Sequence, residues 1–354
     1  MGDANKLNCC HIFAVKPLFT VIVDTVLYGL PLAMRGGIRY MGLRPAMPLR
    51  GIRGMRIALF VIGLIVACSP AFAQDRSTLG WGRLFTNDSF GDGDDRWHTG
   101  SYGISALRGT GWDGRLPTQP GDILEFRAFG QIIAPANLTF SDPADRRYAG
   151  ALSLGLHSHF MLGRAEASVG GDLVIIGPQT KLGQFQTDIH EAFDFVVPQV
   201  LGDQIGNKIA PTLSAELARS FQIGENVTVR PFVAAQAGAE TLVRAGGDIV
   251  IGGAWDNSLM LRDTVTGQRY SGIDGRALGF SLTLGADVAH VFSSAYLPAG
   301  GTVALSDSRT RVRAGMEWQG TRSGIFYGLT YLGPEFEGQD GGQVTGSLNV
   351  NFDF

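Results

Sequence analysis

Apolar and polar residues alternate in many short segments over most of this chain. Two examples are "GALSLGLHSHFML" at 150–162 and "RVRAGMEWQG" at 311–320. Successive side chains of a strand point to opposite faces of a sheet, so each segment predicts a strand with one apolar and one polar face. Clusters of Gly, Asp, Asn and Pro separate them, as in "GTGWDGRLPTQPGD" at 109–122. Repeated segments of about ten alternating residues between turns are typical of a transmembrane β-barrel.

The last segment, "SLNVNFDF" at 347–354, has the same alternation. Its apolar residues, Leu348, Val350, Phe352 and Phe354, share one face. A strand that ends on an aromatic residue resembles the C-terminal strand of Gram-negative outer-membrane barrels, where the terminal aromatic is an assembly signal. A strand of a soluble sandwich could alternate as well, so that alternative stays open at this point.

No run of about 20 apolar residues follows residue 74, so the sequence predicts no transmembrane helix there. A closed barrel also satisfies every backbone polar group inside a bilayer. We therefore predict that residues 74–354 form a single all-β domain. Its expected architecture is a transmembrane antiparallel β-barrel of about 12 strands in the Gram-negative outer membrane.

Residues 177–215 break the alternation. Phe185, Ile189 and Phe193 recur there at helical spacing, which predicts a short helix near 181–194 within a long extracellular loop. We expect this apolar stripe to pack. Gln186 and His190 lie four residues apart and so share another side of the helix, from which His190 can face a groove between helix and barrel.

The N-terminal region contains a secretory signal. Residues 55–73, "MRIALFVIGLIVACSPAFA", combine a basic start, a short apolar run and a small-x-small cleavage site. We interpret Met55 as the native start, residues 1–54 as a non-native extension, and Gln74 as the first residue after cleavage. A lipoprotein signal is the alternative, because "IVAC" ends at Cys68.

Composition narrows the class of protein further. All three cysteines precede Gln74, so no disulfide is predicted in the exported chain. Residues 74–354 carry 21 Lys and Arg against 30 Asp and Glu, which makes a nucleic-acid partner improbable on charge alone. The expected partners are membrane lipids.

One acidic segment, "FTNDSFGDGDDRWHTG" at 85–100, is a candidate for chemistry. It does not match a calcium-binding EF-hand loop, because the twelfth position counted from Asp88 is Thr99 and not Glu. The tip "GDGDD" is interpreted as a solvated turn, which assigns Asp92, Asp94 and Asp95 to solvent. Asn87, Asp88 and Thr99 lie at the predicted strand ends, where side chains can be directed at a common site.

Several motifs, taken in order, resemble one known family. They are Asn87-Asp88, Thr99-Gly100, "DRRYAG" at 145–150, Gly177-Pro178, Gln186 with His190, Asp203-Gln204 and "EF" at 335–336. This order and spacing resemble the calcium-dependent lipid A 3′-O-deacylases of Gram-negative outer membranes. The resemblance spans nearly the whole chain after residue 74, although no single motif is highly specific.

The resemblance implies an outer-membrane hydrolase that removes the 3′-linked acyloxyacyl chain from lipid A in the outer leaflet. It implies His190 as general base toward water, since the chain has no Gly-x-Ser-x-Gly nucleophile motif. Asp88 would bind Ca²⁺, which would stabilise the oxyanion. Asn87 and Thr99 would orient ligands or complete the oxyanion site, and Gln186 would orient the imidazole or water.

The chain departs from the family pattern at some positions. Gly100 stands where many relatives have Asn. Val196 stands where some have an acidic residue six positions after the histidine, and Glu191 or Asp194 are candidates to replace that residue.

Two competing functions remain open. The first is a non-enzymatic porin, adhesin or structural barrel, in which His190 is a surface histidine. The second is a phospholipase with a Ser-His pair, although no serine forms a recognisable motif with another histidine. His157 and His159, on the polar side of a strand, are expected to face the lumen or rim.

Overall fold

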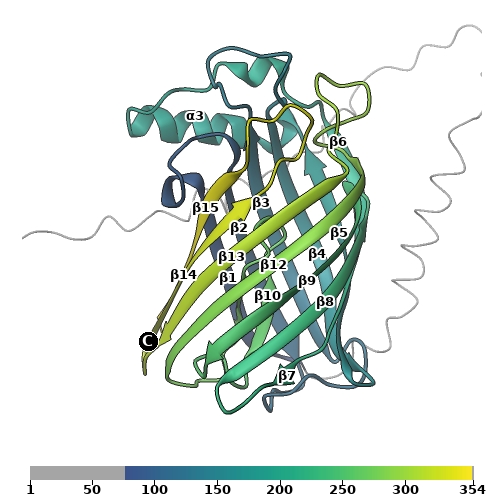
Figure 1. Cartoon of the computed structure of the whole chain (residues 1–354), viewed down its shortest axis with the longest axis vertical. Coiled ribbons are helices and arrows are strands. Elements are labelled where there is room, and N and C mark those ends of the chain that lie inside the picture. Colours follow the sequence, from purple (N-terminus) through teal and green to yellow (C-terminus); the bar gives the residue numbers. More distant parts are fainter. Residues whose placement is uncertain (1–75, 353–354) are drawn as a thin grey trace, which may run out of the picture. The chain divides into compact units, whose positions relative to one another are not determined.

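A computed structural model describes residues 76–352 (Figure 1). The proposed extension 1–54, the signal peptide 55–73 and Phe354 lie outside these residues. The described strands, in order, are β1 Ser77–Asn87, β2 Trp97–Gly109, β3 Ile123–Ala134, β4 Ala149–Leu162, β5 Ala165–Ile176, β6 Lys208–Ala218, β7 Phe221–Gln222, β8 Val227–Ala237, β9 Glu240–Gly252, β10 Leu259–Arg262, β11 Arg269–Ile273, β12 Gly279–Ser294, β13 Ser308–Gln319, β14 Ser323–Leu332 and β15 Gln343–Phe352.

Neighbouring strands pair antiparallel into a closed barrel, and both closing contacts are short. The β6–β8 pairing runs from Leu213↔Ala237 to Ala218↔Phe232, and the two-residue β7 continues it along β8. The β1–β15 pairing consists of Phe85↔Leu348, Thr86↔Ser347 and Asn87↔Gly346. Strands β10 and β11 form a separate two-stranded sheet and are not part of the wall. With β7 counted with β6, twelve of the described strands form the ring, which confirms the predicted barrel.

The two ends of the barrel differ in their loops. One end carries the single described α-helix of residues 76–352, α3 at Leu182–Ala192, together with three 3₁₀ turns: η2 Asp88–Phe90, η3 Pro178–Thr180 and η4 Val200–Asp203. In Figure 1 this end is at the top, opposite the end where β1 begins and β15 ends. Long loops are extracellular in outer-membrane barrels, so α3 lies on the extracellular side. Its bounds agree with the predicted helix near 181–194.

The wall has the two faces that the alternation predicts. Along β13 the burial alternates at every residue from Ser308 to Gln319. Val312 and Met316 are exposed on the outside, whereas Arg311 and Arg313 are buried inside. The outer face is therefore apolar and suits lipid, and the inner face is polar.

Several charges in the lumen form a network of ion pairs. Arg313 contacts Asp248 and Asp287, and Asp287 also contacts Arg244 and Arg311. Buried charges are tolerated only when partners offset the loss of hydration, which explains why these ion pairs form a connected network.

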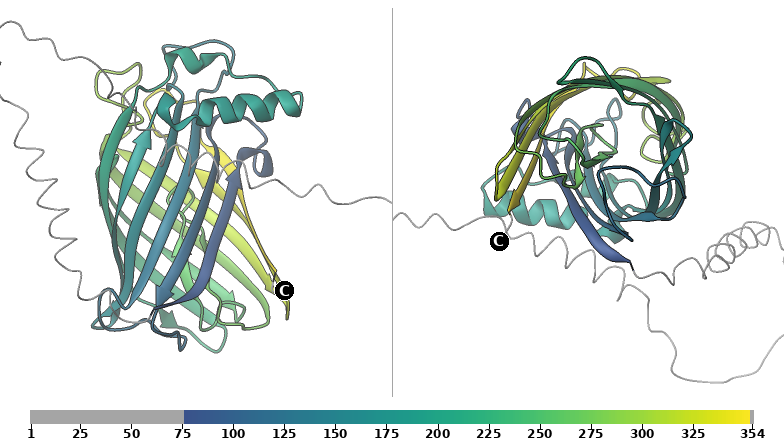
Figure 2. Two further views of the ribbon diagram at one scale, coloured as in Figure 1. Left: turned by 180° about the vertical axis from the view of Figure 1, so that it is seen from behind. Right: turned by 90° about the horizontal axis from the view of Figure 1, so that it is seen from below.

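A hairpin of β10 and β11 lies inside the ring (Figure 2, right). Its residues Leu261 and Tyr270 belong to an apolar cluster with Leu84, Leu107 and Phe326 from the wall. The segment between β9 and β12 thus folds inward and fills part of the lumen. None of the helices described within residues 76–352 is long and apolar enough to cross a bilayer.

Candidate active site

The site begins at the extracellular ends of β1 and β2, which Asn87 joins. Its Oδ1 accepts a hydrogen bond from the backbone N–H of Ser89 at 2.9 Å, which caps η2. Its Nδ2 donates to the carbonyl oxygen of Thr99 at 2.9 Å. Both polar atoms of Asn87 are therefore engaged in holding Asp88 and Thr99 in place. These two hydrogen bonds fit a positioning role for Asn87.

Asp88 and Asp95 form a pair of carboxyl groups beneath α3. Asp88 is buried, and burial raises its pKa to about 8, with a further contribution from the charge of Asp95. Burial also raises the pKa of Asp95, although the charge of His190 and the hydrogen bond from Gln186 oppose this rise. Two neighbouring carboxylates disfavour each other's charged form, so this pair is suited to a cation or a shared proton.

Helix α3 directs Gln186 and His190 onto Asp95. His190 Nε2 lies 3.2 Å from Asp95 Oδ2. Gln186 Nε2 lies 3.4 Å from both Asp95 Oδ1 and His190 Nε2. The interpretation of Asp95 as a solvated turn residue is therefore wrong. The turn folds back under α3, and the Asp95 carboxylate contacts the imidazole of His190. Asp92 and Asp94 do stay on the turn, where both pair with Arg96.

The other imidazole nitrogen fixes the orientation of His190. Its Nδ1 lies 2.6 Å from the carbonyl oxygen of Val196. A carbonyl can only accept, so Nδ1 carries a proton, and the lone pair of the neutral ring is on Nε2. Val196 occupies the position where some relatives have an acidic residue. A backbone carbonyl thus supplies the contact, and neither Glu191 nor Asp194 is needed for it.

The loops around α3 explain several motifs. Gly177 precedes η3 at φ 98°, and a Cβ there would lie 2.8 Å from the backbone of Gly206, so only glycine fits. Asp203 pairs with Arg147 at 3.4 Å. Val200 packs with Tyr148 in an apolar cluster beneath the helix. These contacts place the helix over the strand ends.

Tyr148 is a residue that the sequence did not single out. It is buried within the "DRRYAG" motif, and its hydroxyl has no hydrogen-bond partner in the described part of the chain. Burial, with the nearby charge of Asp95, raises the pKa of its phenol above the usual value. Tyr148 therefore brings a neutral, unengaged donor to the edge of the site.

A buried ion cluster supports the start of β2. Glu335 contacts Arg146, His98 at 3.1 Å and Arg309 at 3.1 Å. Beside it, the Trp97 and Phe336 rings pack edge to face with centroids 6.5 Å apart. The "DRRYAG" and "EF" motifs thus meet beside Thr99. Their separation of nearly two hundred residues explains why sequence alone did not pair them.

Some features of the site fit a hard cation. Asp88 Oδ2 and Gln186 Oε1 are buried and have no hydrogen-bond partner among residues 76–352. Oxygen atoms are the ligands that Ca²⁺ prefers. The same described residues contain no cluster of three or more His, Cys, Asp or Glu side chains arranged around a metal. Asp88 and Asp95 would hold such an ion, with neutral oxygens completing the shell.

The outward side of α3 differs from the prediction. Phe185 is half-buried, whereas Ile189 is exposed and Phe193 is 61% exposed, so the prediction that this apolar stripe packs is wrong for Ile189 and Phe193. The polar Gln186 and His190 are buried instead. The helix thus faces the barrel with Gln186 and His190 and exposes Ile189 and Phe193 on its outer surface.

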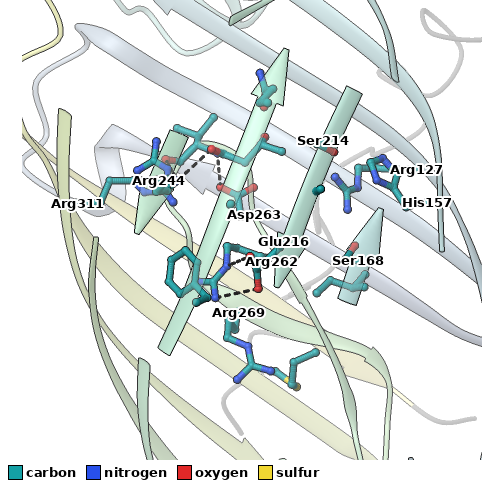
Figure 3. A pocket seen from close by; sticks show the side chains of 18 of the residues that line it. Arg127, His157, Ser168, Ser214, Glu216, Arg244, Arg262, Asp263, Arg269 and Arg311 are labelled. Atoms are coloured by element: carbon teal, nitrogen blue, oxygen red, sulfur yellow. Dashed lines mark hydrogen bonds and ion pairs between the residues drawn. The ribbon is translucent and has the colours of Figure 1, made fainter. Parts of the chain in front are cut away.

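A separate cavity of about 500 Å³ occupies the lumen (Figure 3). Arg127, Glu216 and Arg262 line it, as do His157 and His159. His157 lies 3.1 Å from Asp172, and His159 lies 2.8 Å from Glu125. The two histidines face the lumen, as expected, and each lies against a carboxylate there. The predicted site residues do not line this cavity, so it is separate from the predicted site.

Several solved structures are similar to this chain. A solved structure, LpxR from Salmonella typhimurium, matches with a TM-score of 0.65 at 17% identity and covers 78% of this chain and 100% of that one. The NanC porin follows with a TM-score of 0.35 at 7% identity, covering 78% and 100%. The NalP translocator domain from Neisseria meningitidis gives 0.34 at 13%, covering 85% and 97%. The latter two support no conclusion, and no curated protein sequence matches the chain.

The similarity to the Salmonella structure supports the fold. The family described as "Outer membrane protein LpxR" matches residues 59–354, which is most of the sequence. This chain therefore belongs to the outer membrane protein LpxR family, the lipid A 3′-O-deacylases that its motifs resemble, and is an integral protein of the outer membrane.

Proposed function

We propose that this protein hydrolyses the ester that links the acyloxyacyl chain to the 3′ position of lipid A, with His190 as general base. The observation that carries the proposal is the position of His190. One nitrogen is locked on the Val196 carbonyl, and the other points into a buried site shared with Gln186 and Asp95. An imidazole held in this tautomer can take a proton from water.

The residues have separate tasks in this mechanism. His190 Nε2 accepts a proton from water as the water oxygen attacks the ester carbonyl carbon. The imidazolium then returns that proton to the departing 3′ oxygen of the sugar. Asp95 stabilises the imidazolium through its contact at 3.2 Å, and Gln186 orients the ring. Asn87 holds Asp88 and Thr99 in place.

Ca²⁺ is the proposed cofactor, and Asp88 with Asp95 would hold it. When bound, it would polarise the ester carbonyl and stabilise negative charge that develops on the oxygen. The buried, unengaged oxygens of Asp88 and Gln186 support this proposal. A hard dication would also favour the charged form of Asp88, which burial alone disfavours.

The alternative of a non-enzymatic barrel does not account for this arrangement. A barrel that served only as a pore would have no need for a helix that buries a histidine and a glutamine against the carboxyl group of Asp95 at the rim. Burying unpaired polar atoms costs about 1–3 kcal/mol each, and such a cost is common at functional sites.

The test is mass spectrometry of lipid A from cells that express the wild type, His190→Gln or Asp88→Asn, with and without a calcium chelator. We expect loss of one acyloxyacyl chain only with the wild type in calcium. A general base contributes about 10²–10⁴-fold, so His190→Gln should leave almost no product. Intact lipid A with the folded wild type would exclude the deacylase function, and full activity of His190→Gln would exclude His190 as the base.

A further inference from the structure

Helix α3 has three distinct sides. Its buried side carries Leu182, Gln186 and His190. A second side carries Ile189 and Phe193, which are one helical turn apart and exposed. The third side carries the exposed acids Asp188 and Glu191. Residues three or four apart share a side of a helix, so the apolar stripe lies between the buried side and the acidic side.

The apolar stripe continues beyond the end of the helix. Phe195 is 58% exposed and Val196 is 60% exposed. The Phe193 and Phe195 rings stack with centroids 6.0 Å apart, and Phe195 meets the His190 ring edge to face at 5.7 Å. We call Ile189, Phe193, Phe195 and Val196 the apolar platform. It begins on the outer surface and ends against the proposed base.

The position of α3 indicates what covers this platform. The helix lies across the rim and extends beyond the wall of strands instead of covering the lumen (Figures 1 and 2). The wall itself is an apolar outer face that contacts lipid in an integral outer-membrane barrel. A helix with one apolar side and one charged side is typical of segments that lie in a membrane interface.

We infer that the apolar platform inserts into the acyl-chain region of the outer leaflet and holds His190 at the depth of the acyl chains, while Asp188 and Glu191 remain in water. Contiguous exposed aromatic residues beside a site are costly in water, and lipid removes that cost. Only the effect of insertion on catalysis rests on the proposed function. Insertion itself can be measured without turnover of lipid A.

The first test places a fluorescent label at single cysteines. In a background with Cys9, Cys10 and Cys68 replaced by Ser, Phe193→Cys and the control Glu191→Cys are labelled with an environment-sensitive dye. Each is reconstituted in phosphatidylcholine vesicles that contain lipids with nitroxides on the acyl chains. We expect quenching several-fold stronger at position 193 than at 191. Equal quenching at both positions would overturn the inference.

A second copy of the chain is the other occupant that this test can reveal. In that case the label at 193 would be shielded from lipid nitroxides, and its emission would change with the ratio of protein to lipid. That outcome would also overturn insertion. Labelling results hold whether or not the protein hydrolyses lipid A, so a failure of the proposed function would be seen separately.

The second test concerns catalysis. Phe193 stacks on Phe195, and Phe195 in turn meets the His190 ring. Phe193→Ser should lower kcat/KM for lipid A in vesicles by about tenfold through lost apolar burial, with a smaller loss in detergent micelles. Glu191→Ser is the matched control and should change neither rate. Equal loss in vesicles and micelles would show that Phe193 acts only on the fold of the site.

Discussion

Replacing Asp95 by Asn tests whether this turn residue belongs to the site. The substitution keeps the size and shape of the side chain and removes its charge. Asp94, next to it, provides a matched control. Its side chain is 60% exposed and pairs with Arg96, whereas the Asp95 side chain is 33% exposed and contacts His190. Asp94→Asn therefore changes the same turn by the same chemistry outside the proposed site.

The expected magnitude follows from the contact with His190. Two unit charges about 4 Å apart attract by roughly 4 kcal/mol at an effective dielectric constant of about 20. Solvent reaches part of Asp95, so screening lowers this to ~1–2 kcal/mol. Through this contact alone, Asp95→Asn should lower kcat by about five- to thirtyfold, since about 1.4 kcal/mol is tenfold. Saturating Ca²⁺ offsets the weaker metal binding that the loss of this carboxylate would cause.

The assay is a time course of lipid A deacylation in vesicles at saturating Ca²⁺, followed by mass spectrometry. Heat-modifiable migration on a gel verifies that each variant is folded. We expect Asp94→Asn to stay within about twofold of the wild type, as an exposed ion pair contributes little. Equal rates for Asp95→Asn and Asp94→Asn would refute the assignment of Asp95 to the site.

Three further results are expected. Asn87→Ala should lower the free energy of unfolding by about 1–2 kcal/mol, because it removes the cap of η2 and the bond to Thr99; an unchanged urea midpoint would argue against that role. Burial raises the pKa of Asp88 to about 8, so binding of Ca²⁺ would displace a proton from Asp88. The affinity of the protein for Ca²⁺, measured by calorimetry, should therefore rise between pH 7 and 8, and Asp88→Asn should remove this pH dependence. Burial would raise the pKa of Glu335, but Arg309, His98 and Arg146 outweigh it and hold the pKa well below its usual range. That stabilisation is present above about pH 4.5 and is lost as the pH falls toward the folded-state pKa, so the Tm of the wild type should fall more steeply on acidification than that of Glu335→Gln.

The fold could be predicted because the bilayer imposes it on every strand. Because apolar residues face outward and polar residues face inward, the two kinds alternate along each strand, and in β13 burial alternates at every residue. The inserted β10–β11 hairpin could not be predicted in this way. Leu261 and Tyr270 are buried by contact with Leu84 and Phe326, which are distant in sequence. No local pattern distinguishes such a hairpin from an ordinary turn region.

The site was predictable only in part, for a related reason. Gln186 and His190 could be paired because helical spacing places them together. Asp95 could not, because a "GDGDD" turn has the same composition whether it is solvated or folded under a helix. Its partner Gln186 is 91 residues away. Likewise, the apolar stripe of α3 indicated packing, since sequence does not distinguish a stripe that meets protein from one that meets lipid.

The backbone of Val196 orients His190 without an acidic side chain at that position. A carboxylate beside Nδ1 would hold the imidazole and also stabilise its charged form. Here the carbonyl oxygen of Val196, 2.6 Å from Nδ1, holds the ring. The negative charge that would stabilise the imidazolium is that of Asp95, which lies beside the other nitrogen, Nε2. Val196 lies in the loop that follows α3. Two residues before it, Asp194 has a left-handed backbone conformation with φ 59°. Asp194→Gly should therefore be tolerated, because glycine adopts this conformation without strain, whereas Asp194→Val should lower deacylation without touching a catalytic group.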